Sequence, residues 1–128
     1  MHDSKQSVIS FNAFAKINME RHKDWPTEPH VSVDEWSLNE WAVAIAEETG
    51  ELCGAVKRLN RFKAGYKIKR RKSRIESEAE GVANIKEEIG GIMTYLDLMA
   101  QTLGLTLEEC IRDTFNEVSE REGFHHRI

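Results

Sequence analysis

Apolar residues recur along this chain at intervals of three and four, the spacing of one face of an α-helix. The pattern fills four segments, residues 7–22, 37–62, 77–103 and 106–121. The face of the second segment is made by Leu38, Trp41, Ile45, Leu52, Val56 and Leu59. The face of the third is made by Val82, Ile85, Ile89, Ile92, Leu96, Met99 and Leu103. The pattern predicts an all-α fold, a bundle of four to five helices in which the third helix, apolar on nearly every side, is central.

Capping residues indicate where the helices begin and end. Ser37 with Glu40, and Thr106 with Glu109, have the S/T-x-x-E spacing of a capping box at a helix start. Gly104 follows the third segment, where a C-terminal stop is expected. Between the second and third helices lies a run of basic residues, with eight Lys or Arg in the fourteen positions of RFKAGYKIKRRKSR. Mutual repulsion predicts a mobile basic loop there, at about residues 61–76.

Composition limits the chain to one small domain. It has 128 residues, 18 Lys and Arg against 22 Asp and Glu, and 40% apolar residues. A chain of this length builds a single core, so we expect one domain over residues 1–128. No run approaches the roughly 18 to 20 apolar residues of a membrane span, and the polar N-terminus lacks the pattern of a signal peptide, so we expect a cytoplasmic protein. Cys53 and Cys110 form no CxxC pair and are expected to be reduced thiols.

A carboxylate interrupts the apolar face of the second helix. Between Ile45 and Leu52, the position that continues the spacing is Glu48. Burying an unpaired carboxylate costs several kcal/mol, so Glu48 must pair with a cation, bind a metal ion or be protonated. Glu47 and Glu51 lie within one turn of it, so the three carboxylates form one acidic cluster.

A second acidic pair, Glu87 and Glu88, lies on the third helix. If the two long helices are antiparallel neighbours, these carboxylates face Glu48 and Glu51. Oxygen ligands without nearby His or Cys select a hard cation, which predicts Mg²⁺, with Mn²⁺ as a substitute. A di-iron bundle would need E-x-x-H pairs, and none of the five His lies in either helix. The competing interpretation is that both clusters are solvated helix faces.

Two longer stretches carry a more specific signal, WAVAIAEETGELCGAVKRLNR and KEEIGGIMTYLDLMAQTLGLTLEECIRDTFNEVSER. Together they resemble the MazG-like all-α nucleoside triphosphate pyrophosphatases, over about residues 11–121. The signature of that family is E-E-x-x-E on one helix and E-x-x-D on the next. The resemblance implies Mg²⁺-dependent hydrolysis of (d)NTPs to (d)NMP and pyrophosphate, a house-cleaning role, and a homodimer or homotetramer.

The resemblance also implies roles for individual residues. Glu48, Glu51 and Glu88 would hold Mg²⁺, which bridges the phosphates and lowers the pKa of an attacking water, and Glu47 would orient or deprotonate that water. Candidate substrate-binding residues are Lys57, Arg58, Arg61, Asp97, Asn116 and Arg121. For the three basic residues on the second helix, solvated surface charge is the alternative. For Asp97 it is a buried, hydrogen-bonded carboxylate or a subunit contact.

The sequence departs from the family signature at one position. Glu88 is followed by Ile89, Gly90 and Gly91, so glycine replaces the aspartate of E-x-x-D. Losing a metal ligand weakens metal binding, so activity could be reduced or lost. Two alternatives therefore stay open beside the active enzyme. One is a catalytically impaired nucleotide-binding or structural relative. The other is a nucleic-acid-binding helical module using residues 61–74, against which the net charge of -4 argues.

Overall fold

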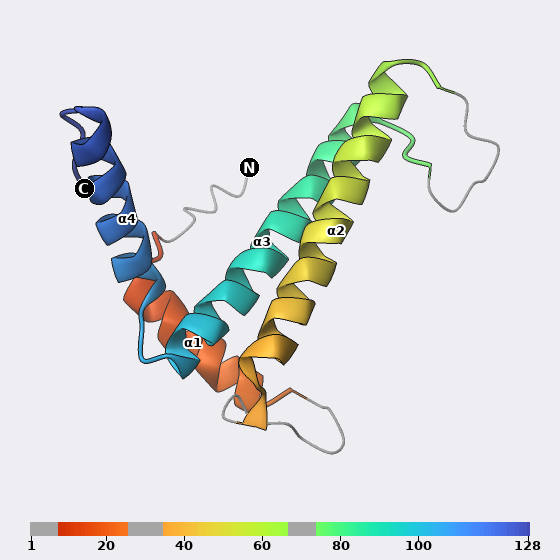
Figure 1. Cartoon of the computed structure of the whole chain (residues 1–128). Helices are drawn as coiled ribbons and strands as arrows, with labels where there is room; N and C mark the ends of the chain where they lie inside the picture. The colour runs from red at the N-terminus through yellow and green to blue at the C-terminus, as the bar shows by residue number, and fades with distance from the viewer. Residues whose placement is uncertain (1–7, 26–34, 67–73) are drawn as a thin grey trace. The chain divides into compact units, whose positions relative to one another are not determined.

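The computed structural model describes residues 8–25, 35–66 and 74–128 and is all-α (Figure 1). Within these ranges the chain forms four α-helices, α1 (Phe11–Lys23), α2 (Leu38–Lys63), α3 (Glu78–Thr102) and α4 (Leu107–Glu122). The predicted fold class is confirmed. None of these helices has the length and apolar character needed to cross a membrane, as far as the described residues go.

Ser37 and Thr106 cap the two helices as predicted, and the reciprocal capping box is seen at Ser37 and Glu40. At the start of α2, the Ser37 hydroxyl accepts a hydrogen bond from the Glu40 amide at 3.3 Å, and the Glu40 carboxylate accepts one from the Ser37 amide. At the start of α4, the Thr106 hydroxyl accepts from the Glu109 amide at 3.1 Å. Gly104, just beyond α3, has a φ of 70°, which a residue with a side chain rarely adopts. These contacts fix where α2 and α4 begin.

The predicted basic loop begins later than its sequence indicated. Arg61 and Lys63 lie in the last turn of α2, and the capping residue Ala64 follows, its amide donating to the carbonyl of Asn60 at 3.0 Å. Basic side chains are favourable at a helix C-terminus because the helix dipole is negative there, so the first charges of the run extend the helix. Residues 67–73 lie outside the described ranges.

Residues 36–96 form one compact unit, a hairpin in which α2 and α3 run antiparallel side by side (Figure 1). Its buried apolar residues are Trp41, Ala55 and Ile75. The two helices approach closely at Gly81, where an added Cβ would lie 2.8 Å from the Cδ1 atoms of both Leu59 and Ile75. Because contacts under 3 Å are not tolerated, this position requires glycine unless its neighbours move.

The second unit contains α1, the residues from Asp97 onward on α3, and α4. Asp97 is 1% exposed and accepts hydrogen bonds from Asn18 at 2.8 Å and Gln101 at 2.9 Å. The Gln101 amide also donates to the carbonyl of Ala15 at 3.1 Å. Of the interpretations offered for Asp97, the structure therefore shows a buried, hydrogen-bonded carboxylate that ties α1 to α3. A contact of Asp97 with nucleotide stays a prediction.

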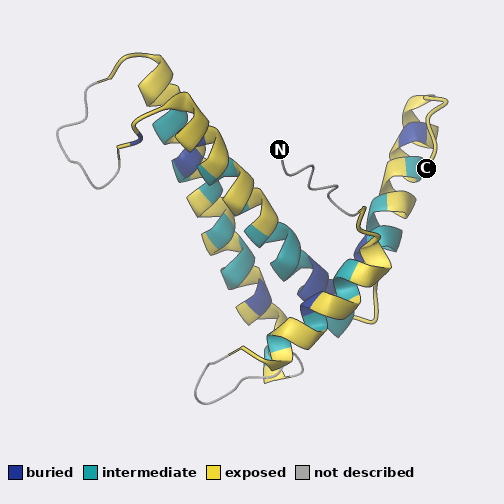
Figure 2. Cartoon of the chain, turned by 180° about the vertical axis from the view of Figure 1, so that it is seen from behind, coloured by how far each residue is buried: buried dark blue, intermediate teal, exposed yellow. Residues whose placement is uncertain are grey.

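The apolar faces are only partly buried. Five residues of the predicted faces of α2 and α3 stay between 38% and 53% exposed, namely Leu38, Val56, Val82, Ile89 and Leu103. Figure 2 shows exposed positions along the outer surfaces of both helices. A pair of helices buries only the stripe along which the two meet, so a helix that is apolar nearly all round keeps much of its apolar surface in solvent.

We expect Asn18→Ala to lower the free energy of unfolding by about 1–3 kcal/mol, because it removes one of the two side-chain hydrogen bonds that a buried Asp97 oxygen accepts. Urea unfolding followed by circular dichroism measures this. Asn12→Ala, an exposed substitution on the same helix, is the matched control and should be neutral or slightly stabilising. Equal effects of the two substitutions would show that the Asn18–Asp97 bond does not stabilise the fold.

Candidate metal centre

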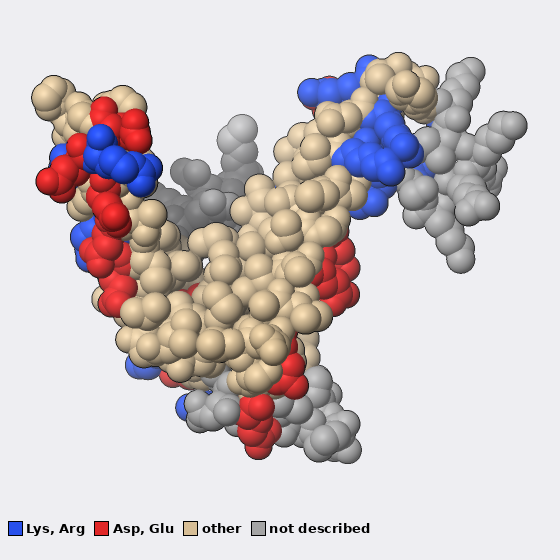
Figure 3. Space-filling model, in the orientation of Figure 1, with Lys and Arg blue, Asp and Glu red and all other residues tan. Residues whose placement is uncertain are grey.

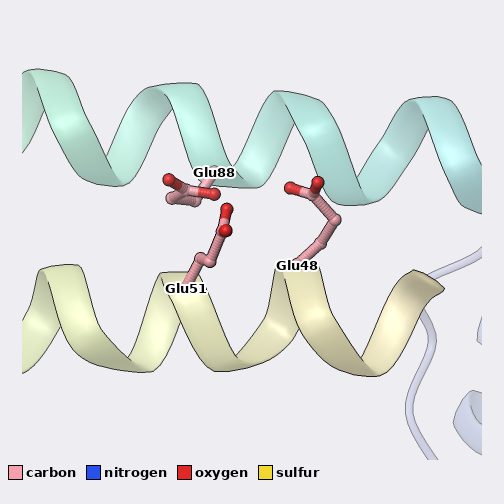
Figure 4. Close-up of side chains that lie close together, drawn as sticks. All are labelled: Glu48, Glu51 and Glu88. Carbon is pink, nitrogen blue, oxygen red and sulfur yellow. The ribbon is translucent and has the colours of Figure 1, made fainter. Parts of the chain in front are cut away.

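Three glutamates from two helices converge within the hairpin. Glu48 and Glu51 lie on α2, one turn apart, and Glu88 lies on α3. Each offers one carboxylate oxygen, and the three oxygens lie within 4.8 Å of one another. Figure 4 shows Glu48 and Glu51 reaching from α2 toward α3, with Glu88 beside them. The antiparallel arrangement proposed from the sequence thus brings these side chains together.

The surroundings of the three carboxylates raise the proton affinity of two of them. Burial, together with the negative charges of Glu51 and Glu47, raises the pKa of Glu48 above its ordinary value of 4.5, and a hydrogen bond with Glu88 opposes the shift. Burial and the charge of Glu51 likewise raise the pKa of Glu88. The negative charge of the cluster is therefore electrostatically unfavourable in the metal-free fold.

Within the described ranges, no cationic side chain pairs with these carboxylates. Four ion pairs join described residues, and none includes Glu48, Glu51 or Glu88. Glu48 and Glu88 are half-buried rather than fully solvated, so the interpretation of a freely solvated helix face fits them poorly. The Glu48 carboxylate could be stabilised by a protein cation, a metal ion or a proton. The described residues provide no cationic partner, which leaves a bound metal ion or a proton.

The residues fit a small, hard divalent cation. All three ligands are carboxylate oxygens, the donors that Mg²⁺ and Mn²⁺ prefer, and no His or Cys joins the described cluster. Oxygens bound to one Mg²⁺ at about 2.1 Å lie roughly 3 to 4 Å apart, which small side-chain rotations reach from the observed spacing. Three carboxylate oxygens would leave further positions of an octahedral Mg²⁺ open to water.

Tyr95 belongs to the surroundings of the cluster and was missed in the sequence. Burial, followed by the negative charges of Glu48, Glu47 and Glu51, raises the pKa of its hydroxyl. Its ring centroid is 6.3 Å from that of the buried Trp41. The signal that could have found it is its position seven residues after Glu88, which is two helical turns along the same face.

The other residues predicted on α2 lie on the same hairpin. Glu47 is exposed and outside the three-carboxylate group, although its charge acts on Glu48. Lys57 and Arg61 are exposed, and Arg58 is half-buried with its guanidinium folded back over Gly54. Figure 3 shows basic side chains gathered near the end of α2, apart from the acidic side chains farther back along the helix. Phosphate contacts of these three basic residues stay predictions.

Asn116 and Arg121 lie on α4, in the other unit, and both are engaged by neighbouring residues. The Asn116 side chain donates to the Ile128 carbonyl at 2.9 Å and accepts from the Ile128 amide at 3.0 Å. Arg121 pairs with Glu122 at 3.1 Å. The role of Asn116 and Arg121 in substrate binding stays a prediction.

Comparison with known proteins decides the family. Residues 37–124, more than half of the chain and including both helices of the acidic cluster, match the MazG nucleotide pyrophosphohydrolase domain. The chain belongs to the MazG family. No curated protein and no solved structure gave a significant match. The resemblance found in the sequence motifs is thereby confirmed, and the carboxylate cluster of this MazG domain has the composition of a metal site.

We expect Mg²⁺ to stabilise the protein in a pH-dependent manner. Since the folded state raises the pKa values of Glu48 and Glu88, the metal-free fold binds protons more tightly than the unfolded chain and loses stability as the pH rises above about 4.5. At neutral pH these carboxylates have lost their protons, and millimolar Mg²⁺ would offset their negative charge, so it should raise the Tm by roughly 5 °C. Near pH 4.5 protons compete with the ion, so Mg²⁺ should have little effect.

Thermal unfolding with and without Mg²⁺ checks this expectation. In the metal-free protein, Glu51→Gln should itself raise the Tm at neutral pH by roughly 2–4 °C, because it removes one of the repelling charges. Glu117→Gln makes the same change of charge on the exposed surface of α4 and should not. A Mg²⁺ effect that does not depend on pH would contradict binding at these carboxylates.

Proposed function

We propose that this protein is a Mg²⁺-dependent nucleoside triphosphate pyrophosphohydrolase that converts (d)NTPs to (d)NMP and pyrophosphate in the cytoplasmic nucleotide pool. The observation that carries the proposal is the convergence of Glu48, Glu51 and Glu88, without a cationic partner among the described residues, inside a MazG nucleotide pyrophosphohydrolase domain. Mn²⁺ is expected to replace Mg²⁺ because it accepts the same oxygen ligands.

The proposed reaction adds water across the anhydride that links the α and β phosphates. When bound, Mg²⁺ supplies positive charge that offsets the charge of the phosphates and makes water more acidic. Glu48, Glu51 and Glu88 hold the ion through their carboxylate oxygens. The carboxylate of Glu47, exposed beside them, takes the proton of the attacking water and returns it to solvent. The oxygen–phosphorus bond of the anhydride breaks, and the two products leave.

The basic residues of α2 are suited to hold the phosphates that extend away from the cluster. Arg58 lies seven residues after Glu51, on the same face of the helix and about 10 Å along its axis. Its guanidinium folds back over Gly54, that is, toward the carboxylates. A planar guanidinium forms paired hydrogen bonds with phosphate oxygens. We assign Arg58 to the phosphates, with Lys57 and Arg61 as additional positive charges.

A second candidate function is favoured by Gly91. The family signature has an aspartate there, and its loss removes one potential ligand. In this alternative the protein binds nucleotide and metal but turns substrate over slowly or not at all. The two candidate functions predict the same binding of nucleotide and metal but different rates of turnover. Nucleotide binding and product release therefore have to be measured on the same preparation.

We expect purified protein incubated with a dNTP panel and Mg²⁺ to release pyrophosphate and the matching dNMP, measured by ion-exchange chromatography. Glu48→Gln, Glu51→Gln and Glu88→Gln should each lower turnover by more than about 100-fold and weaken Mg²⁺ binding. Glu47→Gln should lower kcat by about 10²–10⁴-fold and leave Mg²⁺ affinity nearly unchanged, since Glu47 moves a proton rather than holding the ion.

Glu117→Gln is again the matched control and should retain full activity. Nucleotide binding by calorimetry without any product would support the impaired relative. Pyrophosphate release that all three ligand variants retain would contradict the active site proposed here.

We also propose that the chain acts as a homodimer or homotetramer. Support comes from the apolar side chains that the hairpin leaves exposed on α3, where Val82 is 53% and Ile89 50% exposed. Covering such residues is a common reason for oligomerisation of a small helical chain. We expect sedimentation velocity to give a dimer or tetramer mass, and Ile89→Lys to shift it toward the monomer. A monomer at micromolar concentration in the unsubstituted protein would refute this.

A further inference from the structure

Glu48 occupies the space that a side chain at position 91 would need. A Cβ added to Gly91 would lie 2.8 Å from the Oε2 atom of Glu48 and 3.5 Å from its Cδ atom. The carboxylate of Glu48 thus rests directly against the backbone of α3. Figure 4 shows the same arrangement, with the Glu48 side chain extended from α2 to the neighbouring helix.

The neighbouring glycine provides an internal comparison. Gly90 also lies inside α3, and a Cβ added there would meet no atom within 4 Å. Glycine inside a helix is unfavourable relative to alanine, and both positions carry this disadvantage. The two differ in what a side chain would meet, because a methyl group at Gly90 enters open space and one at Gly91 meets a carboxylate of the candidate metal site.

We propose that Gly91 is a positioning residue for Glu48. By presenting no side chain, it lets the Glu48 carboxylate lie across the hairpin, at the place from which the aspartate of the family signature would project. The chain then holds its ion with three glutamates, and Glu48 covers the position that the missing aspartate leaves. The inference rests on the proposed function only for the identity of the ion, since the close approach of Glu48 to Gly91 does not depend on it.

The proposal changes what Gly91→Asp is expected to do. A new aspartate would need the volume that Glu48 already fills and would add another negative charge to a cluster that no cationic side chain of the described residues neutralises. Glu48 would have to swing away before the new carboxylate could face the ion. In the conformation that Glu48 has here, an aspartate at position 91 would not simply add a fourth ligand, because Glu48 would have to move first.

Calorimetric titration of the full chain with Mg²⁺ tests the positioning role. We expect Gly91→Ala to weaken Mg²⁺ binding by roughly tenfold, as for the loss of a group that orients a metal ligand. Gly90→Ala should bind within twofold of the unsubstituted protein, and both variants should remain helical by circular dichroism. Unchanged affinity in Gly91→Ala, or an equal loss in Gly90→Ala, would overturn the proposal.

A second measurement, on the metal-free protein, keeps this inference separate from the proposed function. Each alanine should raise the Tm through its helix propensity, but Gly91→Ala by less than Gly90→Ala, because Glu48 must move. In a Glu48→Ala background the two alanines should raise the Tm equally. The same difference in both backgrounds would show that Glu48 is not the cause and would overturn the proposal.

The two failures are distinguishable. If the unsubstituted protein binds no Mg²⁺ and releases no pyrophosphate while the Tm difference vanishes in the Glu48→Ala background, the proposed function fails and the pairing of Gly91 with Glu48 stands. If Mg²⁺ binds and pyrophosphate is released while the Tm difference persists without Glu48, the function stands and the role assigned to Gly91 fails.

Discussion

Electrostatic repulsion between carboxylates that two packed helices hold together is the constraint on which the rest of this site depends. The α2–α3 hairpin is stabilised by buried apolar side chains, Trp41 and Ala55 among them, and by the close approach at Gly81. These apolar contacts hold the two helices together even when the negative charges of Glu48, Glu51 and Glu88 are not neutralised. The free energy of apolar burial therefore offsets the repulsion among the three carboxylates. The result is a fold that holds three carboxylates close together in the absence of any cation.

Most of the fold and the three glutamates of the acidic cluster could be predicted because both follow from helical spacing. The four helices, both capped starts and the stop at Gly104 came from three- and four-residue intervals and from turn residues whose effects are local. Glu48 was found because a carboxylate broke an apolar stripe. Its meeting with Glu88 needed only one further assumption, that the two long helices, as their lengths and apolar stripes suggest, are antiparallel neighbours.

What the sequence did not reveal depends on contacts between residues far apart in the chain. Nothing local to Asp97 indicates that Asn18, 79 positions away, donates a hydrogen bond to it. Tyr95 carries no charge pattern of its own, and its place beside the carboxylates is set by how the two helices face each other. The start of the basic loop was predicted a few residues too early for a different reason. A run of basic residues was read as repulsive throughout, whereas its first members benefit from the helix dipole.

The contact between Glu48 and Gly91 has a bearing on how families of this kind are recognised. A motif written letter by letter treats each position as independent, so a glycine in place of an acid counts as a defect. In three dimensions two residues on facing helices can share a single volume, and a long side chain on one helix becomes compatible with an absent one on the other. Position 91 is therefore better described by the space around it than by the residue it holds. Where a larger side chain on one helix compensates for a smaller one on the facing helix, homologous sites can differ in sequence and keep the same chemistry.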